Sequence, residues 1–453
     1  MERFTIRRGS ARASAVAPAP YSDAAHMEKL VIEGGYPLSG TVVPAGNKNA
    51  ALPILAASLL TDEELVIGNV PRIRDVDAML ALLEDLGVRV MWLDDHEVSL
   101  RADSIHDHTV DAELASHIRA SFLLAGPLLA RVGEAHMPAP GGDFIGRRRL
   151  DPHLDALRAL GARIEADRGY TMHAPDGLRA CDFFMDEPSV MATENSLMAA
   201  ALTPGRSTIR NAASEPHVQD LARLLTSMGA RIEGIGSNVL TVHGQARLGG
   251  ARHAISPDHI EVASFMALAA VTGGELRIKN TVPEDLEMIR MVFGRLGLRS
   301  HHDGADLLVP PEQRLAVRDD VGDAIPKIDD GPWPAFPADL TSIALAVATQ
   351  AQGTVLIFEK MFENRLFFVD KLSSMGARIV LCDPHRAIVS GPSRLHGERM
   401  ESPDIRAGMA MLIASLCAEG VSEIGNVGQI DRGYERIDDR LRALGARIER
   451  VPA

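Results

Sequence analysis

Three basic residues stand at the starts of apolar, helix-like segments, where a positive charge is ordinarily disfavoured. They are Lys48 in AGNKNAALP, Arg119 in HIRASF and Arg406 in PDIRAGM. The N-terminus of a helix carries the positive end of its dipole, so a cation there gains no stability from the helix itself. An anion bound between the cation and the free backbone N–H groups would reverse that balance. These segments therefore predict an anionic ligand, with Asn49 beside Lys48 sharing its site.

Three further helix starts carry polar residues that need no ligand to explain them. They are Ser189 in PSVMATEN, Asp258 in SPDHIEV and Asp339 in FPADLTS. Serine and aspartate are good N-caps, because a side-chain oxygen can accept from a free N–H group of the first turn. From the residues alone, capping accounts for all three.

The segment PAPGGDFIGRRRLDPHLDAL combines three glycines, three consecutive arginines at 147–149 and one acid, Asp143. It stands where other parts of the chain run directly from strand to helix. Glycine-rich loops are common in proteins, but this one gathers three cations and an acid in an acidic chain. We interpret it as a ligand-binding loop with Asp143 at its tip. A solvated surface loop is the alternative.

Two later clusters, MFENRLFF and QIDRGYERIDDRL, place Arg365 and Arg432 at comparable loop positions, and we expect both to contact the ligand. Glu435 and Arg436 are more typical of a solvated face. The pair His301 and His302 is also expected to face solvent rather than to bind a metal. The chain has no GxxxxGK[ST] phosphate loop, and EGIGSN lacks the spacing of a dinucleotide-binding motif.

Composition limits the classes of partner. The 453 residues are 46% hydrophobic, enough for large cores, and the net charge of −14 argues against nucleic acid or an anionic membrane. No apolar run is long enough for membrane insertion. The three cysteines are far apart, which indicates reduced thiols in the cytoplasm rather than disulfides or a zinc site: Cys181, Cys382 and Cys417.

The first 26 residues are rich in Ser, Ala, Pro and Arg and lack the apolar region of a secretory signal. We expect residues 1–26 to be a disordered N-terminal extension, with Met27 as a possible working start. A transit peptide is the alternative.

One structural unit recurs six times, roughly every 70 residues. In each copy a helix-like stretch ends in glycine and leads into a short apolar strand, as in LTSMGARIE, and a more apolar helix lies upstream. The unit reads as strand, buried helix, strand, amphipathic helix, strand. Six such units predict an α/β protein of two similar domains, three units in each, with an open solenoid as the alternative. The six glycines are Gly87, Gly161, Gly229, Gly297, Gly376 and Gly445.

At GNKNAALP, PGGDFIGRRRLDPH, PSVMATEN, FPADL, FENR and DRGYERIDDRL, the chain closely resembles the UDP-N-acetylglucosamine 1-carboxyvinyltransferases, which are enolpyruvyl transferases. The resemblance covers residues 27–453, and it is weaker to the related shikimate-pathway transferases. It implies an inside-out α/β barrel in each of two domains, with helix N-termini facing a cleft. One domain would comprise 27–47 and 258–453, and the other 48–257 with the catalytic loop 138–153.

The resemblance implies addition followed by elimination: the sugar 3′-hydroxyl attacks phosphoenolpyruvate, and the ketal loses phosphate, in the first committed step of peptidoglycan synthesis. Asp339 would take the hydroxyl proton. Asp143, where the commoner family member has Cys, would protonate C3. Lys48, Arg148 and Arg432 match cations that hold phosphate, and Arg365 and Arg406 match arginines near the carboxylate and phosphate.

The nucleotide-sugar contacts implied by the resemblance are Arg119, Arg148, Arg149, Leu150, Asp151, Pro152, Glu187, Pro188, Ser189 and Val190, and Met361 is also expected to contact substrate. Glu187 replaces a lysine and His259 an arginine. An enolpyruvyl transferase for another nucleotide and a non-catalytic nucleotide-sugar-binding paralogue are the alternatives. No cofactor or metal is implied, and a cytoplasmic monomer is favoured.

Overall fold

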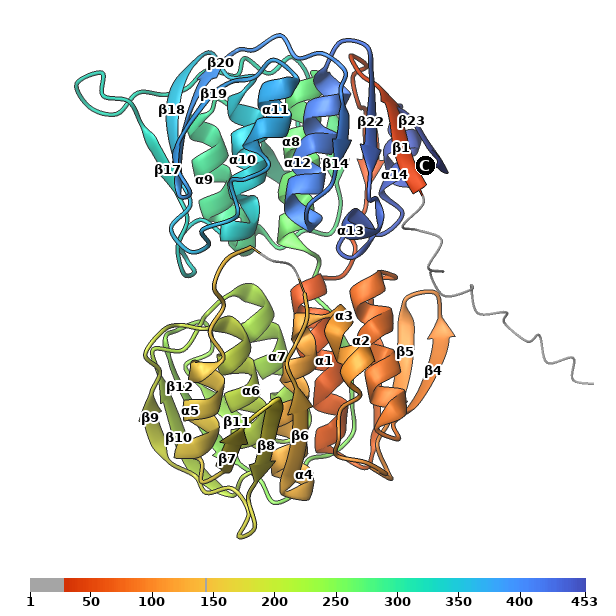
Figure 1. Ribbon diagram of the computed structural model, residues 1–453, viewed down its shortest axis with the longest axis vertical. Helices are drawn as coiled ribbons and strands as arrows, with labels where there is room; N and C mark the ends of the chain where they lie inside the picture. Colours follow the sequence, from red (N-terminus) through yellow and green to blue (C-terminus); the bar gives the residue numbers. More distant parts are fainter. Residues whose placement is uncertain (1–27, 143–144) are drawn as a thin grey trace, which may run out of the picture.

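The computed structural model describes residues 28–142 and 145–453, and it forms two lobes stacked along the long axis (Figure 1). The chain starts in the upper lobe with β1 (Glu28–Glu33) and β2 (Gly40–Val42). It enters the lower lobe at α1 (Lys48–Ala56) and returns at α8 (His259–Thr272). The expected N-terminal extension 1–26 and the loop residue Asp143 lie outside the described residues.

The described residues of the lower lobe form three sheets, with strand orders β13-β3-β5-β4, β6-β8-β7 and β11-β12-β10-β9. Its other strands and helices are β3 (Glu64–Gly68), β4 (Arg89–Asp94), β5 (Glu97–Arg101), β6 (Glu134–Pro138), β7 (Arg163–Ala166), β8 (Gly169–His173), β9 (Asp182–Phe184), β10 (Gly205–Arg210), β11 (Arg231–Glu233), β12 (Val239–Gly244), β13 (Ala251–Ala254), η2 (Ala57–Leu60), α2 (Arg74–Asp85), α3 (Ala112–His117), η3 (Arg119–Leu124), α4 (Ala125–Val132), α5 (Asp151–Ala159), α6 (Val190–Ala201) and α7 (Pro216–Ser227).

In the described part of the upper lobe there are also three sheets, β21-β22-β1-β23, β15-β16-β14-β2 and β17-β18-β20-β19. Its remaining elements are β14 (Leu276–Ile278), β15 (His301–Asp303), β16 (Asp306–Val309), β17 (Lys327–Asp329), β18 (Gly353–Phe358), β19 (Arg378–Asp383), β20 (Arg386–Gly391), β21 (Arg399–Glu401), β22 (Val421–Gly425), β23 (Arg447–Pro452), η4 (Pro283–Leu286), α9 (Glu287–Arg295), η5 (Ala338–Leu340), α10 (Thr341–Ala348), α11 (Val369–Ser374), α12 (Ile405–Cys417), α13 (Gly428–Asp431) and α14 (Ile437–Ala443).

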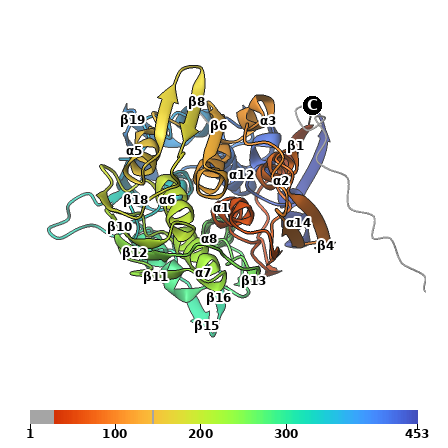
Figure 2. The same cartoon turned by 90° about the horizontal axis from the view of Figure 1, so that it is seen from below.

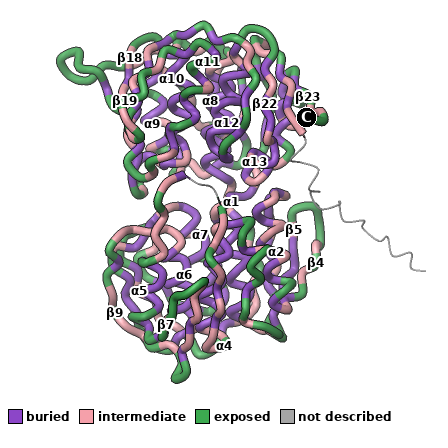
Figure 3. Tube along the Cα trace, viewed as in Figure 1, coloured by how far each residue is buried: buried purple, intermediate pink, exposed green. Residues whose placement is uncertain are grey.

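The apolar segments predicted to be buried helices are buried. All eight residues of α10 and almost all of α8 and α12 are inaccessible to solvent, as are most residues of α1 and α6 (Figure 3). Seen from below, α1 and α6 run through the middle of the lower lobe, with strands toward its rim (Figure 2). Each fully buried Leu or Ile contributes about 1.5–3 kcal/mol relative to exposure, so these helices supply much of the stability of each lobe.

Two hydrophobic cores form, one in each lobe. One joins side chains from Leu30 to Val42 with side chains from Ile260 to Ile448. The other contains side chains between Ala50 and Ile255. The two cores are separate, one on each side of the boundary between the lobes.

Glycine ends the amphipathic helices as the sequence predicted. The six glycines of the repeated unit have φ between 86° and 110°, the left-handed region that other residues adopt only under strain. Four asparagines that follow strands adopt the same left-handed conformation. Their φ values lie between 52° and 58°: Asn69, Asn211, Asn280 and Asn426.

In the described part of the chain, no helix is both long enough and apolar enough to cross a bilayer.

Candidate active site

A cavity of about 520 Å³ lies between the lobes. Helix starts from both lobes line it, from α1 and α6 below and from η5 and α12 above, together with loop residues 145–149 and 331–337. Most of the residues expected to bind substrate line this one cavity: Lys48, Asn49, Arg119, Arg148, Arg149, Glu187, Pro188, Ser189, Val190, Asp339, Met361, Arg365 and Arg406. Leu150, Asp151, Pro152 and Arg432 do not line it.

Asp339 is held between two buried arginines. Its Oδ1 lies 2.7 Å from Arg365 Nη2, and its Oδ2 lies 3.0 Å from Arg406 Nη2. Burial alone would raise the pKa of Asp339, but the charges of Arg406 and Arg365 hold it well below its usual range. The carboxylate of Asp339 is therefore ionised at neutral pH.

The capping interpretation is wrong for Asp339 and correct for the other two residues. Asp339 lies in the first turn of η5, which has no side-chain cap, and its carboxylate binds Arg365 and Arg406 instead. Ser189 accepts from the backbone N–H of Ala192 at 3.4 Å, and Asp258 accepts from that of Ile260 at 2.8 Å. The local sequence pattern is the same for an N-cap aspartate and for an aspartate that binds an arginine distant in sequence, so it cannot distinguish the two.

Lys48 and Arg432 meet at a carboxylate that the sequence did not single out. Asp75, in the first turn of α2, has Oδ2 2.8 Å from Lys48 Nζ and Oδ1 2.8 Å from Arg432 Nε. Burial would raise the pKa of Asp75, but Lys48 and Arg432 lower it below its ordinary value. Because acids are common in first helical turns, no local pattern distinguishes Asp75 from a surface residue.

The loop beyond β6 reaches the upper lobe through its backbone. The N–H of Asn364 donates to the carbonyl of Ile145 at 3.1 Å, and the N–H of Arg147 donates to Glu363 Oε2 at 3.1 Å. Gly146 has φ 135°, and a Cβ on it would lie 2.9 Å from the backbone nitrogen of Glu363. The close approach of the lobes therefore requires glycine at this position.

Arg119, from the lower lobe, hydrogen-bonds to the same loop. Its Nη2 donates to the carbonyl of Arg148 at 2.6 Å, and the guanidinium also lines the cavity. Nearby, Arg149 Nη1 lies 2.7 Å from Asp186 Oδ2 and 3.6 Å from Glu187 Oε2. Asp186 and Glu187 thus offset the charge of Arg149 at this edge of the site.

Neutral aromatic groups form another part of the wall. The rings of His217 and His259 stack with centroids 6.4 Å apart, and Trp333 lies edge-on to His259. Burial lowers the pKa of His217 to about 3 and that of His259 to about 4, so both rings are uncharged at neutral pH. His259, where the resemblance implies an arginine, therefore brings no positive charge to this wall.

Glu435 corrects a second expectation. Its sequence context is typical of a solvated face, but its side chain is only 13% exposed. It accepts from the backbone N–H of Arg72 at 2.9 Å and lies 2.9 Å from His96 Nε2, both in the other lobe. Arg436 is exposed and pairs with Asp439 on its own helix.

Comparisons with known proteins identify the family. A family model for EPSP synthase (3-phosphoshikimate 1-carboxyvinyltransferase) matches residues 32–441. UDP-N-acetylglucosamine 1-carboxyvinyltransferase of Bradyrhizobium diazoefficiens is 57% identical over 424 residues, covering 94% of this chain and 98% of that protein. The protein of that name from Treponema denticola is 53% identical over 423 residues, covering 93% and 99%. This chain belongs to the UDP-N-acetylglucosamine 1-carboxyvinyltransferase family.

Solved structures agree with this membership at the level of the fold. The enolpyruvyl transferase NikO from Streptomyces tendae superimposes with a TM-score of 0.84 at 24% identity, covering 94% of this chain and 99% of that one. EPSP synthase from Acinetobacter baumannii gives a TM-score of 0.72 at 17% identity, covering 94% and 100%. The relatives confirm the family resemblance predicted from the sequence. The solved structures confirm the α/β fold class.

Proposed function

We propose that this enzyme transfers the enolpyruvyl group of phosphoenolpyruvate to the 3′-hydroxyl of UDP-N-acetylglucosamine and releases phosphate, the first committed step of peptidoglycan synthesis. The observation that carries the proposal is the ionised Asp339 between Arg365 and Arg406, in a cavity that Lys48 and Arg148 also line. The family membership supports the same reaction.

Asp339 takes the proton of the attacking hydroxyl in this proposal. A carboxylate paired to two arginines is a weak base, because both partners favour its charged form. When an anionic substrate binds Arg365 and Arg406, it weakens their ion pairs with Asp339. The pKa of Asp339 then rises, and the carboxylate becomes a better proton acceptor. Binding of the anionic substrate thus makes Asp339 a better base toward the hydroxyl of the other substrate.

Asp143 is the proposed acid that protonates C3 of phosphoenolpyruvate. It lies outside the described residues, but the chain on either side of it reaches the site. A Cβ on Gly142 would lie 2.9 Å from that of Arg119, and Ile145 lines the cavity. A carboxylic acid can do the work of the usual Cys thiol if its pKa is raised toward neutrality.

Lys48, Arg148 and Arg432 hold the phosphate in this proposal, and Arg365 and Arg406 hold the carboxylate and phosphate. Fixed positive charges stabilise a transition state in which negative charge builds up on oxygen. Asp75 aligns Lys48 and Arg432, so we assign it a positioning role.

The nucleotide sugar occupies the side of the cavity formed by Arg119, Arg148, Arg149, residues 187–190 and Met361, and it extends toward residues 150–152, which do not line the cavity. Glu187 is acidic and His259 is neutral, where the resemblance implies a lysine and an arginine. The two residues alter the charge of the wall that faces the nucleotide, and they do not alter the reaction.

We also infer the architecture in more detail than the comparisons give it. Each lobe is an inside-out barrel of three repeats, with helices inside and sheets outside. Residues 27–47 with 258–453 form one domain, and residues 48–257, with the loop 138–153, form the other. The two separate hydrophobic cores support this division.

Phosphate release from phosphoenolpyruvate with different acceptors tests the function. We expect release with UDP-N-acetylglucosamine and none with UMP or shikimate 3-phosphate. Equal release with shikimate 3-phosphate, or a product lacking the enolpyruvyl ether at the sugar 3′-oxygen by mass spectrometry, would contradict the proposal.

A further inference from the structure

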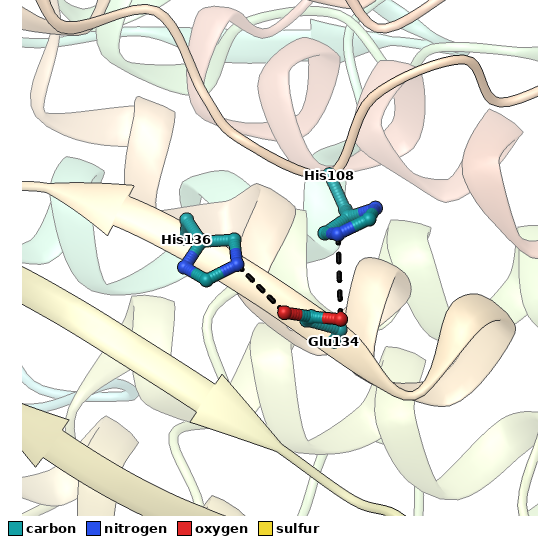
Figure 4. A group of neighbouring side chains, drawn as sticks. All are labelled: His108, Glu134 and His136. Atoms are coloured by element: carbon teal, nitrogen blue, oxygen red, sulfur yellow. Dashed lines mark hydrogen bonds and ion pairs between the residues drawn. The ribbon is translucent and has the colours of Figure 1, made fainter.

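Two histidines and a glutamate gather on the lower lobe, and none of them lines the cavity (Figure 4). Glu134 and His136 are two residues apart on β6, so both side chains point to the same face of the sheet. His108 lies on the segment beside β6. Its carbonyl accepts from the N–H of His136 at 2.8 Å, which fixes the two backbones against each other.

The possible ligand atoms of this cluster converge. Glu134 Oε1 lies 2.7 Å from His136 Nε2, and Glu134 Oε2 lies 3.3 Å from His108 Nε2. One ligand atom from each of the three side chains lies within 4.8 Å of the others. Ligand atoms bound to zinc at about 2.0–2.1 Å in tetrahedral geometry are about 3.3 Å from one another, so small side-chain rotations would complete the site.

The next strand supports these ligands from the side. In the pairing of β6 with β8, His136 lies opposite Thr171 and Glu134 opposite His173. The Thr171 hydroxyl is 3.4 Å from His136 Nδ1, and His173 Nδ1 is 3.5 Å from Glu134 Oε1. A hydrogen bond at Nδ1 leaves Nε2 to face the cluster, the arrangement typical of a metal-binding imidazole.

The types of ligand in the cluster indicate which class of cation it would bind. Two imidazoles and one carboxylate suit zinc and other late first-row divalent ions, whereas magnesium prefers oxygen ligands. The side chains are 32–42% exposed, so an ion can reach them from solvent. Three protein ligands leave a fourth position for water.

We propose that His108, Glu134 and His136 form a binding site for one late first-row divalent metal ion, with Zn²⁺ as the representative. The ion joins the segment around His108 to β6, the strand that leads into the loop carrying Asp143. Its expected effect is on the stability of this edge of the lower lobe. The proposal does not depend on the enzymatic function.

Isothermal titration of the tag-free, metal-stripped full chain with Zn²⁺ tests the site. We expect one ion bound per chain, and no comparable heat with Mg²⁺. His108→Ala, His136→Ala and Glu134→Gln should each lower the affinity by about 100-fold or more, beyond the ~10–100-fold typical of losing a supporting contact. Glu134→Gln keeps a hydrogen-bonding side chain and removes a metal ligand, so it separates a metal site from a polar surface cluster.

The double variant His301→Ala/His302→Ala is the control, because it removes from the upper lobe as many histidines as the proposed site contains. It should bind Zn²⁺ like the parent. Thr171→Val should weaken binding by about 10–100-fold through loss of the contact to His136 Nδ1. Zn²⁺ should raise the unfolding temperature of the parent and the control, but not that of His136→Ala.

Absence of stoichiometric Zn²⁺ binding by the parent would overturn the proposal. So would retention of parental affinity in both His108→Ala and Glu134→Gln, provided that their circular dichroism matches that of the parent. Loss of binding in the His301/His302 control would place the ion elsewhere.

Discussion

Asp75 Oδ1, on α2 of the lower lobe, lies 2.8 Å from Nε of Arg432, which follows α13 of the upper lobe. The other oxygen of the same carboxylate holds Lys48 of the lower lobe at 2.8 Å. One buried acid thus places two of the proposed phosphate-binding cations, and it links the position of Arg432 to the approach of the lobes.

Asp75→Asn should impair substrate binding more than folding. The amide keeps the shape of the side chain but removes the charge that aligns Lys48 and Arg432. Hydrogen bonds to charged groups contribute about 1.5–3 kcal/mol, so we expect kcat/KM for phosphoenolpyruvate to fall by about 10- to 100-fold. Steady-state kinetics with varied phosphoenolpyruvate measures this. Asp77→Asn, in the same helical turn, is the control and should stay within a few-fold of the parent; equal effects of the two variants would contradict the role of Asp75.

Asp339→Asn should abolish turnover and preserve the fold. The change is nearly isosteric, but an amide cannot accept the hydroxyl proton. Loss of a general base typically lowers kcat by about 10²–10⁴-fold. Phosphate release by the variant, compared with its circular dichroism, measures the effect. Ser189→Ala, which removes a helix cap beside the cavity, should cost far less in kcat, and an Asp339→Asn variant with near-parental turnover would rule out the proposed base.

Epoxide inhibitors test the assignment of Asp143. A thiolate is a strong nucleophile toward an epoxide, and a carboxylate is a much weaker one. We expect the parent to resist epoxides of the fosfomycin type, and Asp143→Cys to remain active and lose activity with time in their presence. Progress curves with and without the epoxide provide the measurement.

Asp143→Asn should be nearly inactive, because an amide cannot donate the required proton. The activity of the parent should also fall as Asp143 ionises, at lower pH than in Asp143→Cys. None of Cys181, Cys382 and Cys417 lines the cavity. Time-dependent inactivation of the parent, with an adduct on one of these cysteines, would show that the proton donor is placed wrongly.

Glu359 gives a prediction about pH and stability. Burial and the nearby Asp330 raise the pKa of Glu359 from 4.5 to about 8. Between these values the folded state holds a proton that the unfolded state has lost, so stability decreases as pH rises, by up to about 1.4 kcal/mol per pH unit. Glu359→Gln imitates the protonated form and should therefore gain stability over the parent as pH increases from 6 to 8.

Denaturant midpoints of the parent and Glu359→Gln at pH 6 and pH 8 measure this difference. The exposed Glu275 supplies the control, and Glu275→Gln should follow the parent at both values. A gap between parent and Glu359→Gln that narrows with rising pH would show that the carboxyl is not held protonated.

The sequence by itself determined the local elements and where charge would collect. The spacing of apolar residues identified the buried helices, since a helix enclosed on all sides must be apolar on all sides. The glycines at 87, 161, 229, 297, 376 and 445 marked helix ends, because a left-handed residue there is a local requirement. A cation at a helix start is disfavoured by the positive end of the helix dipole, and this can be recognised from the sequence alone. On that ground the sequence identified Lys48, Arg119 and Arg406 as candidate ligand-binding residues.

Only the tertiary structure decided which partner each polar side chain takes. Asp339 fits a local cap pattern, yet it binds Arg365 and Arg406. Asp75 resembles any acid in a first turn until Arg432 approaches from the other lobe. His108 and His136 become neighbours only when their segment and strand pair. In each case the partner is distant in sequence, and the packing of lobes and sheets, which no local pattern encodes, brings the charges together.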